Sequence, residues 1–301
     1  MKNNLIKSIV NNDRRALAKA LTIVESTAHG DILSTEAIIS SLPPYKSMKS
    51  KVIGFSGITG SGKSSLIEEL GKKLLVDNKK VAVLAIDPSS PIHGGSILGD
   101  KTRMDILSSH PNCFVRPVPS KNQNGGVSRS SQEAILIFNA AGYDYIFIET
   151  VGVGQAEHNV HRLCDCLILN LLPATGDELQ GVKKGINELA DIILINKSDG
   201  ALKTQAEITA NEYKKTLSIP IISTSIFEQK SIEKILSLIS DFFINGNNKI
   251  EKKRASNYQH WVRTLAHNKI LSSLSEIKIN EEISNPYKAK EILIRKLKDI
   301  L

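Results

Sequence analysis

The hydrophobic pattern of the central part of the chain predicts its fold class. Between residues 52 and 243, short runs that are apolar at every position alternate with longer segments whose apolar residues recur at helical spacing. Runs that are apolar on both faces are typical of parallel strands covered by helices on each side. The helical segments between them complete strand–helix–strand crossovers. The sequence therefore predicts a doubly wound, mostly parallel α/β sheet with strands at 52–55, 81–86, 145–148, 166–172, 192–195 and 220–223.

The two ends of the chain show helical patterns instead. Near the N-terminus, Asn12 or Asp13 is placed to cap a helix, and the prolines at 43–44 end the helical pattern. The C-terminal pattern packs on the central domain or crosses to a second subunit, and the sequence does not decide between the two. The apolar residues at helical spacing are Leu17, Ala20, Leu21 and Val24 in the first helix, and Trp261, Leu265 and Leu274 in the C-terminal zone.

A glycine-rich loop follows the first predicted strand and leads into a helical pattern. This strand–loop–helix order is the context that a phosphate-binding loop requires. Glycines allow the backbone to turn tightly and to bring several N–H donors onto phosphate oxygens, and the helix adds the positive end of its dipole. Lys63 is expected to reach the β- and γ-phosphates, and the Ser64 hydroxyl to take one Mg²⁺ position. The predicted loop consists of Gly57, Ile58, Thr59, Gly60, Ser61, Gly62, Lys63, Ser64 and Ser65.

The string Asn-Lys-Ser-Asp at 196–199 directly follows the predicted strand at 192–195. Asp199 can accept two hydrogen bonds from the N1 and N2 donors of guanine, which adenine lacks. Lys197 is expected to pack its stem over the base, and Asn196 to tie this string to the phosphate loop. Alone the string is a weak signal, but its place after a phosphate loop and at a strand end predicts a P-loop GTPase that binds GTP and GDP.

The GTPase prediction divides the chain into three parts. We expect an N-terminal helical segment over 1–48, the P-loop GTPase domain over 49–245 and a C-terminal helical arm over 246–301.

Acidic residues are predicted at the ends of two central strands. Asp87 follows the strand at 81–86, and Glu149 follows the strand at 145–148. Ligands of open α/β sheets bind at this edge, and Mg²⁺ is held by one or two carboxylates together with waters and phosphates. Asp87, Asp100 and Glu149 are therefore candidate magnesium groups, and Glu149 is also a candidate for orienting the attacking water. The glycine-rich segment 94–103 is expected to order around the γ-phosphate and the metal.

Composition changes the expected partners rather than the fold. The net charge is +8, but the basic runs lie beside acids, as on a solvated surface. Aromatic residues make up 5% of the chain, which leaves few platforms for stacking nucleic-acid bases. No apolar run approaches the ~20 residues of a membrane span, and no signal-peptide pattern is visible. We therefore expect a cytoplasmic protein that binds neither nucleic acid nor membrane.

Several strings resemble one family of GTPases. The strings DPSSPIHGGSILGDKTRM at 87–104, ETVGVGQAE at 149–157 and GDELQGVKKGINELADIILINKSDG at 176–200 are similar to the MeaB/ArgK group, as is the phosphate loop. The resemblance spans about residues 12–245. The string KKRASNYQHWV at 252–262 is similar, more loosely, to the helical dimerisation arm of that family.

This resemblance implies a function and a set of ligands. It implies a GTPase chaperone of a cobalamin-dependent acyl-CoA mutase, above all methylmalonyl-CoA mutase, which gates adenosylcobalamin loading and protects or reactivates the mutase. It also implies a homodimer that binds GTP or GDP with Mg²⁺. By matching, the phosphate loop at 57–65 holds GTP, and the string at 196–199 recognises guanine. Asp87, Asp100 and Glu149 serve magnesium and hydrolysis, and the segment 155–189 signals to the mutase.

The chain departs from the family pattern at three places. The second guanine-contacting loop of the family usually reads Ser-Ala-x, whereas this chain has Ser225, Ile226 and Phe227. The backbone N–H of Ile226 can still reach guanine O6. The phosphate loop has Thr-Gly-Ser at 59–61 where Pro-Gly-Ala is common, and Pro-Ile-His at 91–93 replaces a more polar stretch. Neither change removes a group that catalysis needs.

Two alternative functions stay open. The first is a metallocentre-insertion GTPase, for which Cys164 and Cys166 are the candidate ligands, although Cys166 opens an apolar strand and a packing role is favoured. The second is a kinase of an arginine/ornithine transport system, an older assignment within the same family, for which no acceptor-site chemistry is visible.

Overall fold

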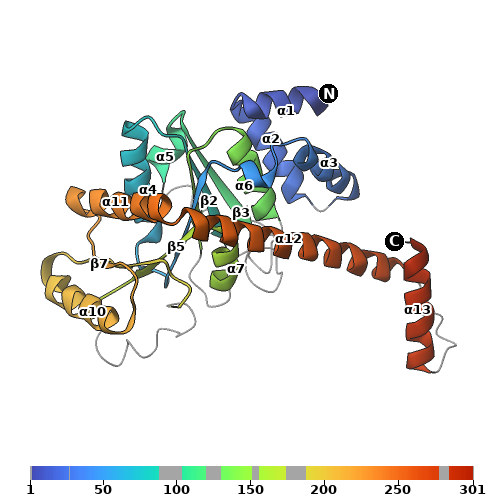
Figure 1. Ribbon diagram of the computed structural model, residues 1–301. Coiled ribbons are helices and arrows are strands. Elements are labelled where there is room, and N and C mark those ends of the chain that lie inside the picture. The colour runs from blue at the N-terminus through green and yellow to red at the C-terminus, as the bar shows by residue number, and fades with distance from the viewer. Residues whose placement is uncertain are drawn as a thin grey trace. The chain divides into compact units, whose positions relative to one another are not determined.

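The predicted strands lie side by side in one seven-stranded sheet (Figure 1). The computed structural model describes residues 2–26, 28–87, 104–119, 130–150, 156–173, 188–277 and 285–300. Every neighbouring pair of strands is parallel, in the order β3-β2-β4-β1-β5-β6-β7. The predicted α/β fold is therefore confirmed. The strands are β1 Lys51–Ser56, β2 Val81–Asp87, β3 Cys113–Pro119, β4 Tyr145–Glu149, β5 Cys166–Leu171, β6 Ile192–Ile195 and β7 Ile221–Ser223.

Helices cover both faces of this sheet. The chain moves from β1 to β2 and β3 on one side, and then returns through β4 to β5, β6 and β7 on the other. Because crossovers between parallel strands are right-handed, this reversal places the connecting helices on opposite faces. The first face carries α4 Lys63–Val76, α5 Asp105–Ser109 and α11 Gln229–Asn245, and the crossovers on the second face contain α6 Ser130–Ala140, α7 Ala156–Leu163 and α10 Lys203–Thr216. A short 3₁₀ turn, η3 Gly200–Leu202, precedes α10.

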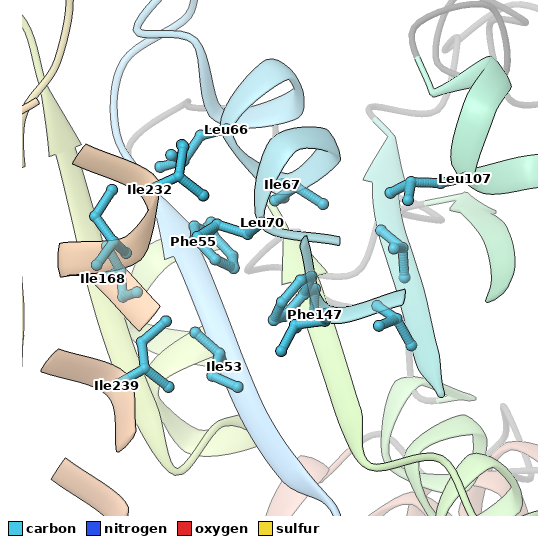
Figure 2. Packing of buried hydrophobic residues seen from close by; sticks show 14 of the residues in the cluster. Ile53, Phe55, Leu66, Ile67, Leu70, Leu107, Phe147, Ile168, Ile232 and Ile239 are labelled. Atoms are coloured by element: carbon cyan, nitrogen blue, oxygen red, sulfur yellow. The ribbon is translucent and has the colours of Figure 1, made fainter. Parts of the chain in front are cut away.

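The largest part of the core lies under α4 and α11. Figure 2 shows Leu66 and Ile67 of α4 above Phe55 and Phe147 of the sheet, with Ile232 of α11 beside them. All of these side chains are at most 5% exposed. The two phenylalanine rings meet edge to face, with centroids 5.3 Å apart. Each buried side chain of this size contributes roughly 1.5–3 kcal/mol, so this layer fixes the start of α4 over the end of β1.

The second face is packed closely against β1 because position 54 is a glycine. A Cβ added at Gly54 would lie 2.8 Å from Val160 Cγ1 and 2.9 Å from Cys164 Sγ. Real Cβ atoms do not approach other atoms this closely, since the repulsion would force the neighbours apart. The glycine therefore allows α7 and the residue that follows it to lie directly on the central strand.

The N-terminal segment is helical, as the sequence predicts. Asp13 caps α2, because its Oδ1 accepts a hydrogen bond from the Ala16 N–H at 2.7 Å. Asn12, the alternative cap, instead lies before it with a φ of 58°. The predicted apolar face of α2 is buried. The elements are α1 Lys2–Val10, α2 Arg14–Glu25, α3 His29–Ser40 and the 3₁₀ turn η1 Tyr45–Ser47 after the two prolines.

Two arginines join α2 to the edge strand β3. The Arg14 guanidinium donates hydrogen bonds to the Cys113 carbonyl at 2.5 Å and to the His110 carbonyl at 3.3 Å. At the other end, Arg116 donates two hydrogen bonds to the Glu25 carboxylate, one of them 2.8 Å long from Nε to Oε1. Bidentate pairs of this kind are geometrically specific. They fasten the N-terminal helices along the edge of the sheet.

The strand β3 is the one strand of the described sheet that the sequence pattern did not predict. Its residues Cys-Phe-Val-Arg-Pro-Val-Pro include a charge and two prolines. Proline has no N–H for a neighbouring strand, so it is tolerated at a sheet edge. Because β3 pairs only with β2, Pro117 can take part without leaving an inner strand short of a donor.

Three aspartates fix the N-terminal edge of the sheet by the same arrangement. Each aspartate lies directly before a strand and forms two hydrogen bonds with one residue in or next to the neighbouring strand. The aspartate N–H donates to the carbonyl of that residue, and the aspartate carboxylate accepts from its N–H. The pairs are Asp144 with Lys80, Asp165 with Val52, and Asp191 with Leu167, at N···O distances between 2.8 and 3.0 Å. The carboxylate thus replaces a ladder bond where the strands begin.

The C-terminal unit consists of two helices. Residues Met1–Ile250 form one compact unit and Glu251–Leu301 another. The second holds most of α12 Asn247–Glu276 and α13 Pro286–Ile300, with Trp261, Leu265 and Leu274 half-buried. No helix among the described residues is long and apolar enough to cross a membrane. The predicted division at residues 48 and 245 stays a prediction.

We expect Asp165→Ala to lower the free energy of unfolding by about 1–3 kcal/mol, because the buried Val52 N–H loses its acceptor. Asp165→Asn keeps an acceptor oxygen of the same size and should lose clearly less. Urea denaturation of both variants measures the difference. Equal losses would show that the hydrogen bond to Val52 is not what Asp165 contributes.

Alkaline pH should destabilise the protein through Tyr143. Burial raises the pKa of this tyrosine to about 12, against the opposing charge of Arg14. The folded state therefore holds the phenol proton more tightly, and stability is lost as the pH rises from about 10 to about 12. The Tyr143 hydroxyl is buried without a hydrogen-bond partner among the described residues. At about pH 8, Tyr143→Phe should thus unfold at the same urea concentration as the wild type or at a higher one. Between about pH 8 and about pH 11, the free energy of unfolding should fall by roughly 1–2 kcal/mol less in Tyr143→Phe than in the wild type. Equal losses at high pH would contradict this.

Candidate nucleotide-binding site

The predicted phosphate loop joins the end of β1 to the start of α4. Gly57, Gly60 and Gly62 have φ angles of 138°, 82° and 88°. Residues other than glycine rarely adopt these backbone angles, so the glycines determine the path of the loop. Gly62 is the residue directly before α4, and its left-handed conformation turns the chain into the helix.

Two glycines of the loop are also required by close neighbours. A Cβ added at Gly57 would lie 2.0 Å from the Asn170 carbonyl oxygen, and one added at Gly62 would lie 2.6 Å from Asn196 Nδ2. Asn170 belongs to β5, and Asn196 follows β6. The strand β5 and the residue that follows β6 therefore contact the loop closely at Gly57 and at Gly62.

Lys63 is folded beneath the loop. Its side chain is 6% exposed, and Nζ donates hydrogen bonds to the Gly57 carbonyl at 2.8 Å and to the Ile58 carbonyl at 3.0 Å. A buried ammonium group is costly unless oxygen atoms surround it. The loop carbonyls supply these atoms and hold the positive charge at the concave side of the turn, where it can attract phosphate oxygens.

Ser64 and Glu149 meet at the same edge of the sheet. The Ser64 hydroxyl donates a hydrogen bond of 2.5 Å to Glu149 Oε1. Register explains the contact, because Glu149 is paired with Phe55 just before the phosphate loop begins. Glu149 is 6% exposed. Asp87 ends β2 at this edge, as predicted, but the structure does not describe its side chain. Asp100 and the segment 94–103 lie outside the described residues.

The loops after β6 and β7 are joined through the predicted guanine-binding residues. Asn196 Nδ2 donates a hydrogen bond to the Ser61 carbonyl at 2.8 Å, which links this string to the phosphate loop. Lys197 has a φ of 58° and is exposed. The Ser225 hydroxyl donates a 2.5 Å hydrogen bond to Asp199 Oδ2 and so orients that carboxylate.

The second guanine loop presents its residues in different ways. Ser225 is buried, and its hydroxyl oxygen accepts the Phe227 N–H at 3.2 Å. The Phe227 side chain is 83% exposed. Ile226 is half-buried and packs against the large core cluster. The contact of the Ile226 N–H with guanine stays a prediction.

Sequence reasoning missed Asn170. Its side chain is fully buried, and Nδ2 donates a second hydrogen bond to the Ser61 carbonyl, also at 2.8 Å. The signal was present, because Asn170 is the one polar residue in the apolar run at 166–172. Without the register of β5 beside β1, that run did not indicate which face the amide occupies.

Comparison with known proteins assigns the family. A family model described as methylmalonyl Co-A mutase-associated GTPase MeaB matches residues 17–278. The chain belongs to the MeaB family of GTPases. This confirms the resemblance and the prediction of a GTPase that binds guanine nucleotide.

Individual relatives agree over most of the chain. The sequence is 37% identical to GTPase ArgK of Escherichia coli strain K12 over 303 residues, which cover 96% of this chain and 90% of that protein. It is 40% identical over 291 residues to a mitochondrial methylmalonic aciduria type A homolog of Caenorhabditis elegans, covering 89% of this chain and 73% of that protein. The crystal structure of an LAO/AO transport system kinase matches with a TM-score of 0.75 and 28% identity, over 99% of this chain and 97% of the other.

The cysteines of this MeaB-family chain are packed in its interior. Cys113, Cys164 and Cys166 are all buried, and none of them forms a disulfide bond within the described residues. Burial raises the pKa of the Cys113 thiol to about 12, so this thiol stays protonated near neutral pH. No group of three or more His, Cys, Asp or Glu residues that could hold a metal ion is found within the part of the chain that the structure describes.

We expect Asp199→Asn to weaken GTP binding by roughly 1.5–3 kcal/mol, because the amide can no longer accept both guanine donors. Xanthine carries a carbonyl oxygen where guanine carries its amino group, so the same variant should bind xanthosine nucleotides better than the wild type does. Titration with fluorescent nucleotides measures both affinities. Retained preference for GTP over ATP and over xanthosine triphosphate would refute the assignment of Asp199 to the base.

Proposed function

We propose that this MeaB-family GTPase is the chaperone of a cobalamin-dependent acyl-CoA mutase of the methylmalonyl-CoA mutase type. It gates adenosylcobalamin loading and protects or reactivates the mutase. The observation that carries the proposal is the family model, which matches residues 17–278 and whose description couples the GTPase to methylmalonyl-CoA mutase. The Caenorhabditis elegans relative, which carries the name of a methylmalonic aciduria protein, supports it.

Within this proposal, the phosphate loop holds the nucleotide phosphates. The Lys63 ammonium is placed beneath the loop, where it stabilises negative charge on the β- and γ-phosphates. Asn196, Lys197 and Asp199 hold the guanine base, and Ser225 orients Asp199 through its hydrogen bond. These groups position the nucleotide and compensate its charge, which is the main contribution that a protein makes to phosphoryl transfer.

The residues at Ser64 fit a magnesium ion. A serine hydroxyl and a carboxylate are hard oxygen donors of the kind that Mg²⁺ prefers, and Ser64 Oγ and Glu149 Oε1 lie 2.5 Å apart beside the loop. Bound magnesium would neutralise charge that develops on the phosphates. Ser64 and Glu149 would hold it, together with Asp87 and Asp100, and Glu149 is also the candidate for orienting the attacking water.

The same hydrogen bond is suited to a nucleotide-dependent switch. Glu149 is the last residue of β4, so a change in the groups around Ser64 reaches the segment that follows this strand directly. A γ-phosphate or magnesium ion that competes for Ser64 would break or reshape the contact. Loss of the γ-phosphate on hydrolysis can thus be read by a protein bound beside this edge.

A homodimer is part of the proposal. The C-terminal helices expose large apolar side chains, including Tyr258 and Val262 on α12 and Tyr287 on α13, which are 42%, 44% and 74% exposed. Apolar side chains in such numbers on two adjacent helices are suited to an interface.

The proposed function predicts that the client mutase accelerates GTP hydrolysis. Phosphate release should be measured for the protein alone and with methylmalonyl-CoA mutase or isobutyryl-CoA mutase from the same organism, each with and without adenosylcobalamin. The rate should rise severalfold with the client, and a complex should be visible by size-exclusion chromatography. A mutase that does not use cobalamin is the control and should change nothing. An unchanged rate and no complex with every cobalamin-dependent mutase of the organism would refute the proposal.

Two further assays test the other two functions. Stoichiometric binding of Zn²⁺ or Ni²⁺ that Cys164→Ser and Cys166→Ser abolish would indicate a metallocentre-insertion GTPase. Labelled γ-phosphate that appears on a protein or metabolite instead of as free phosphate would indicate a kinase.

A further inference from the structure

A buried asparagine of β5 contacts the phosphate loop at two points. The carbonyl oxygen of Asn170 lies where a side chain at Gly57 would be, 2.0 Å from an ideal Cβ. Its side-chain Nδ2 donates a hydrogen bond of 2.8 Å to the Ser61 carbonyl. One residue therefore lies against both the first glycine of the loop and its fifth residue, and spans the turn from below.

The position of Asn170 follows from the register of the sheet. Ser56 of β1 is paired with Leu169 of β5, so Asn170 is level with the first residue of the loop. Side chains two residues apart share a face of a strand, and Ile168 packs in the core cluster beneath α4. Asn170 thus belongs to the face on which the loop turns into α4.

The Ser61 carbonyl receives two amide donors. Asn170 Nδ2 and Asn196 Nδ2 are each 2.8 Å from this oxygen, and both side chains are at most 1% exposed. A carbonyl oxygen has two lone pairs, so the two bonds fill its capacity. The peptide that joins Ser61 to Gly62 is planar, and its N–H points opposite to its carbonyl. The two asparagines hold the Ser61 carbonyl toward themselves, so the Gly62 N–H points away from them. It therefore points toward the place at the start of the helix where phosphate is expected to bind.

The stability of the sheet does not explain an asparagine at this place. Asn170 is surrounded by the apolar run Cys-Leu-Ile-Leu-Asn-Leu, and its Oδ1 is buried without a hydrogen-bond partner among the described residues. A buried amide with an unused acceptor costs free energy relative to an apolar side chain of similar volume. The contact that accounts for the residue is its bond to the loop.

We propose that Asn170 is a positioning residue for the nucleotide, which together with Asn196 holds the Ser61–Gly62 peptide in the orientation that binds phosphate. The proposal rests on the proposed placement of the phosphates at this loop. Asn170 itself does not touch the nucleotide. It acts by keeping the loop in its binding conformation before the nucleotide arrives, which lowers the cost of ordering on binding.

The test compares Asn170→Leu with a matched variant at the opposite end of β1. Asn139 is also an asparagine that links distant segments, since its Oδ1 accepts hydrogen bonds from the Lys49 and Ser50 N–H groups. Asn170→Leu should bind GDP and GTP about five-fold more weakly, which corresponds to one hydrogen bond, and should release GDP faster. The thermal midpoint of its nucleotide-free form should be equal to or above that of the wild type. Asn139→Leu should show the reverse, with a lower midpoint and unchanged affinity.

Four results would overturn the proposal. The first is that Asn170→Leu binds and releases GDP as the wild type does, and the second is that it loses affinity while its thermal midpoint falls. The third is that Asn170→Leu loses affinity for GTP but not for GDP. The fourth is that the losses of binding free energy in Asn170→Leu and Asn196→Leu are strictly additive in the double variant. The double variant should lose more than the product of the single losses, because only there is the buried Ser61 carbonyl left without either donor. If Asn170→Leu does not fold, Asn170→Ala is measured in the same way.

Lys63→Ala distinguishes failure of this proposal from failure of the underlying site. Unchanged GTP affinity in Lys63→Ala would show that the phosphates do not bind at this loop. Lost affinity in Lys63→Ala together with wild-type affinity in Asn170→Leu would refute only the role of Asn170.

Discussion

The site depends on the absence of side chains at two positions of the phosphate loop. At Gly57 a Cβ would meet the backbone of β5, and at Gly62 it would meet the Asn196 amide. Backbone cannot move aside as the end of a flexible side chain can, so the first contact is the stricter one. Because both contacts exist, the loop lies directly on the ends of β5 and of the β6 loop. The two hydrogen bonds to the Ser61 carbonyl require this closeness.

The N-terminal edge of the sheet fixes the strand register on which the close packing of the phosphate loop depends. Asp144, Asp165 and Asp191 each pair with one residue of a neighbouring strand through both a backbone and a carboxylate bond. A parallel sheet that is buried on both faces has little polar pattern of its own to specify register. The aspartates supply such a pattern at the N-terminal edge. The strand ends that carry Glu149, Asn170 and Asn196 then reach the C-terminal edge at matching heights.

The sequence allowed the fold to be predicted, and the features that it did not reveal have physical causes. Six strands were placed within one residue at each end because their runs are almost entirely apolar. The edge strand β3 was missed because Arg116 and two prolines interrupt its apolar pattern. An edge strand tolerates such residues. Asn170 was missed because a polar residue in a strand acquires meaning only from its neighbour across the sheet. The bond between Ser225 and Asp199 likewise joins residues whose proximity depends on the pairing of β6 with β7.

The buried charges show how such a site can favour binding without being unstable when empty. Lys63 and Glu149 are each 6% exposed, and an uncompensated charge at that depth would be costly. Loop carbonyls accept hydrogen bonds from Lys63, and the Ser64 hydroxyl donates one to Glu149, so neutral dipoles help to solvate the two charges. A phosphate can compete with the loop carbonyls for Lys63, and a cation can compete with the Ser64 hydroxyl for Glu149. The charges therefore remain available to the ligand, and the glycines and asparagines that fix the loop keep them in place.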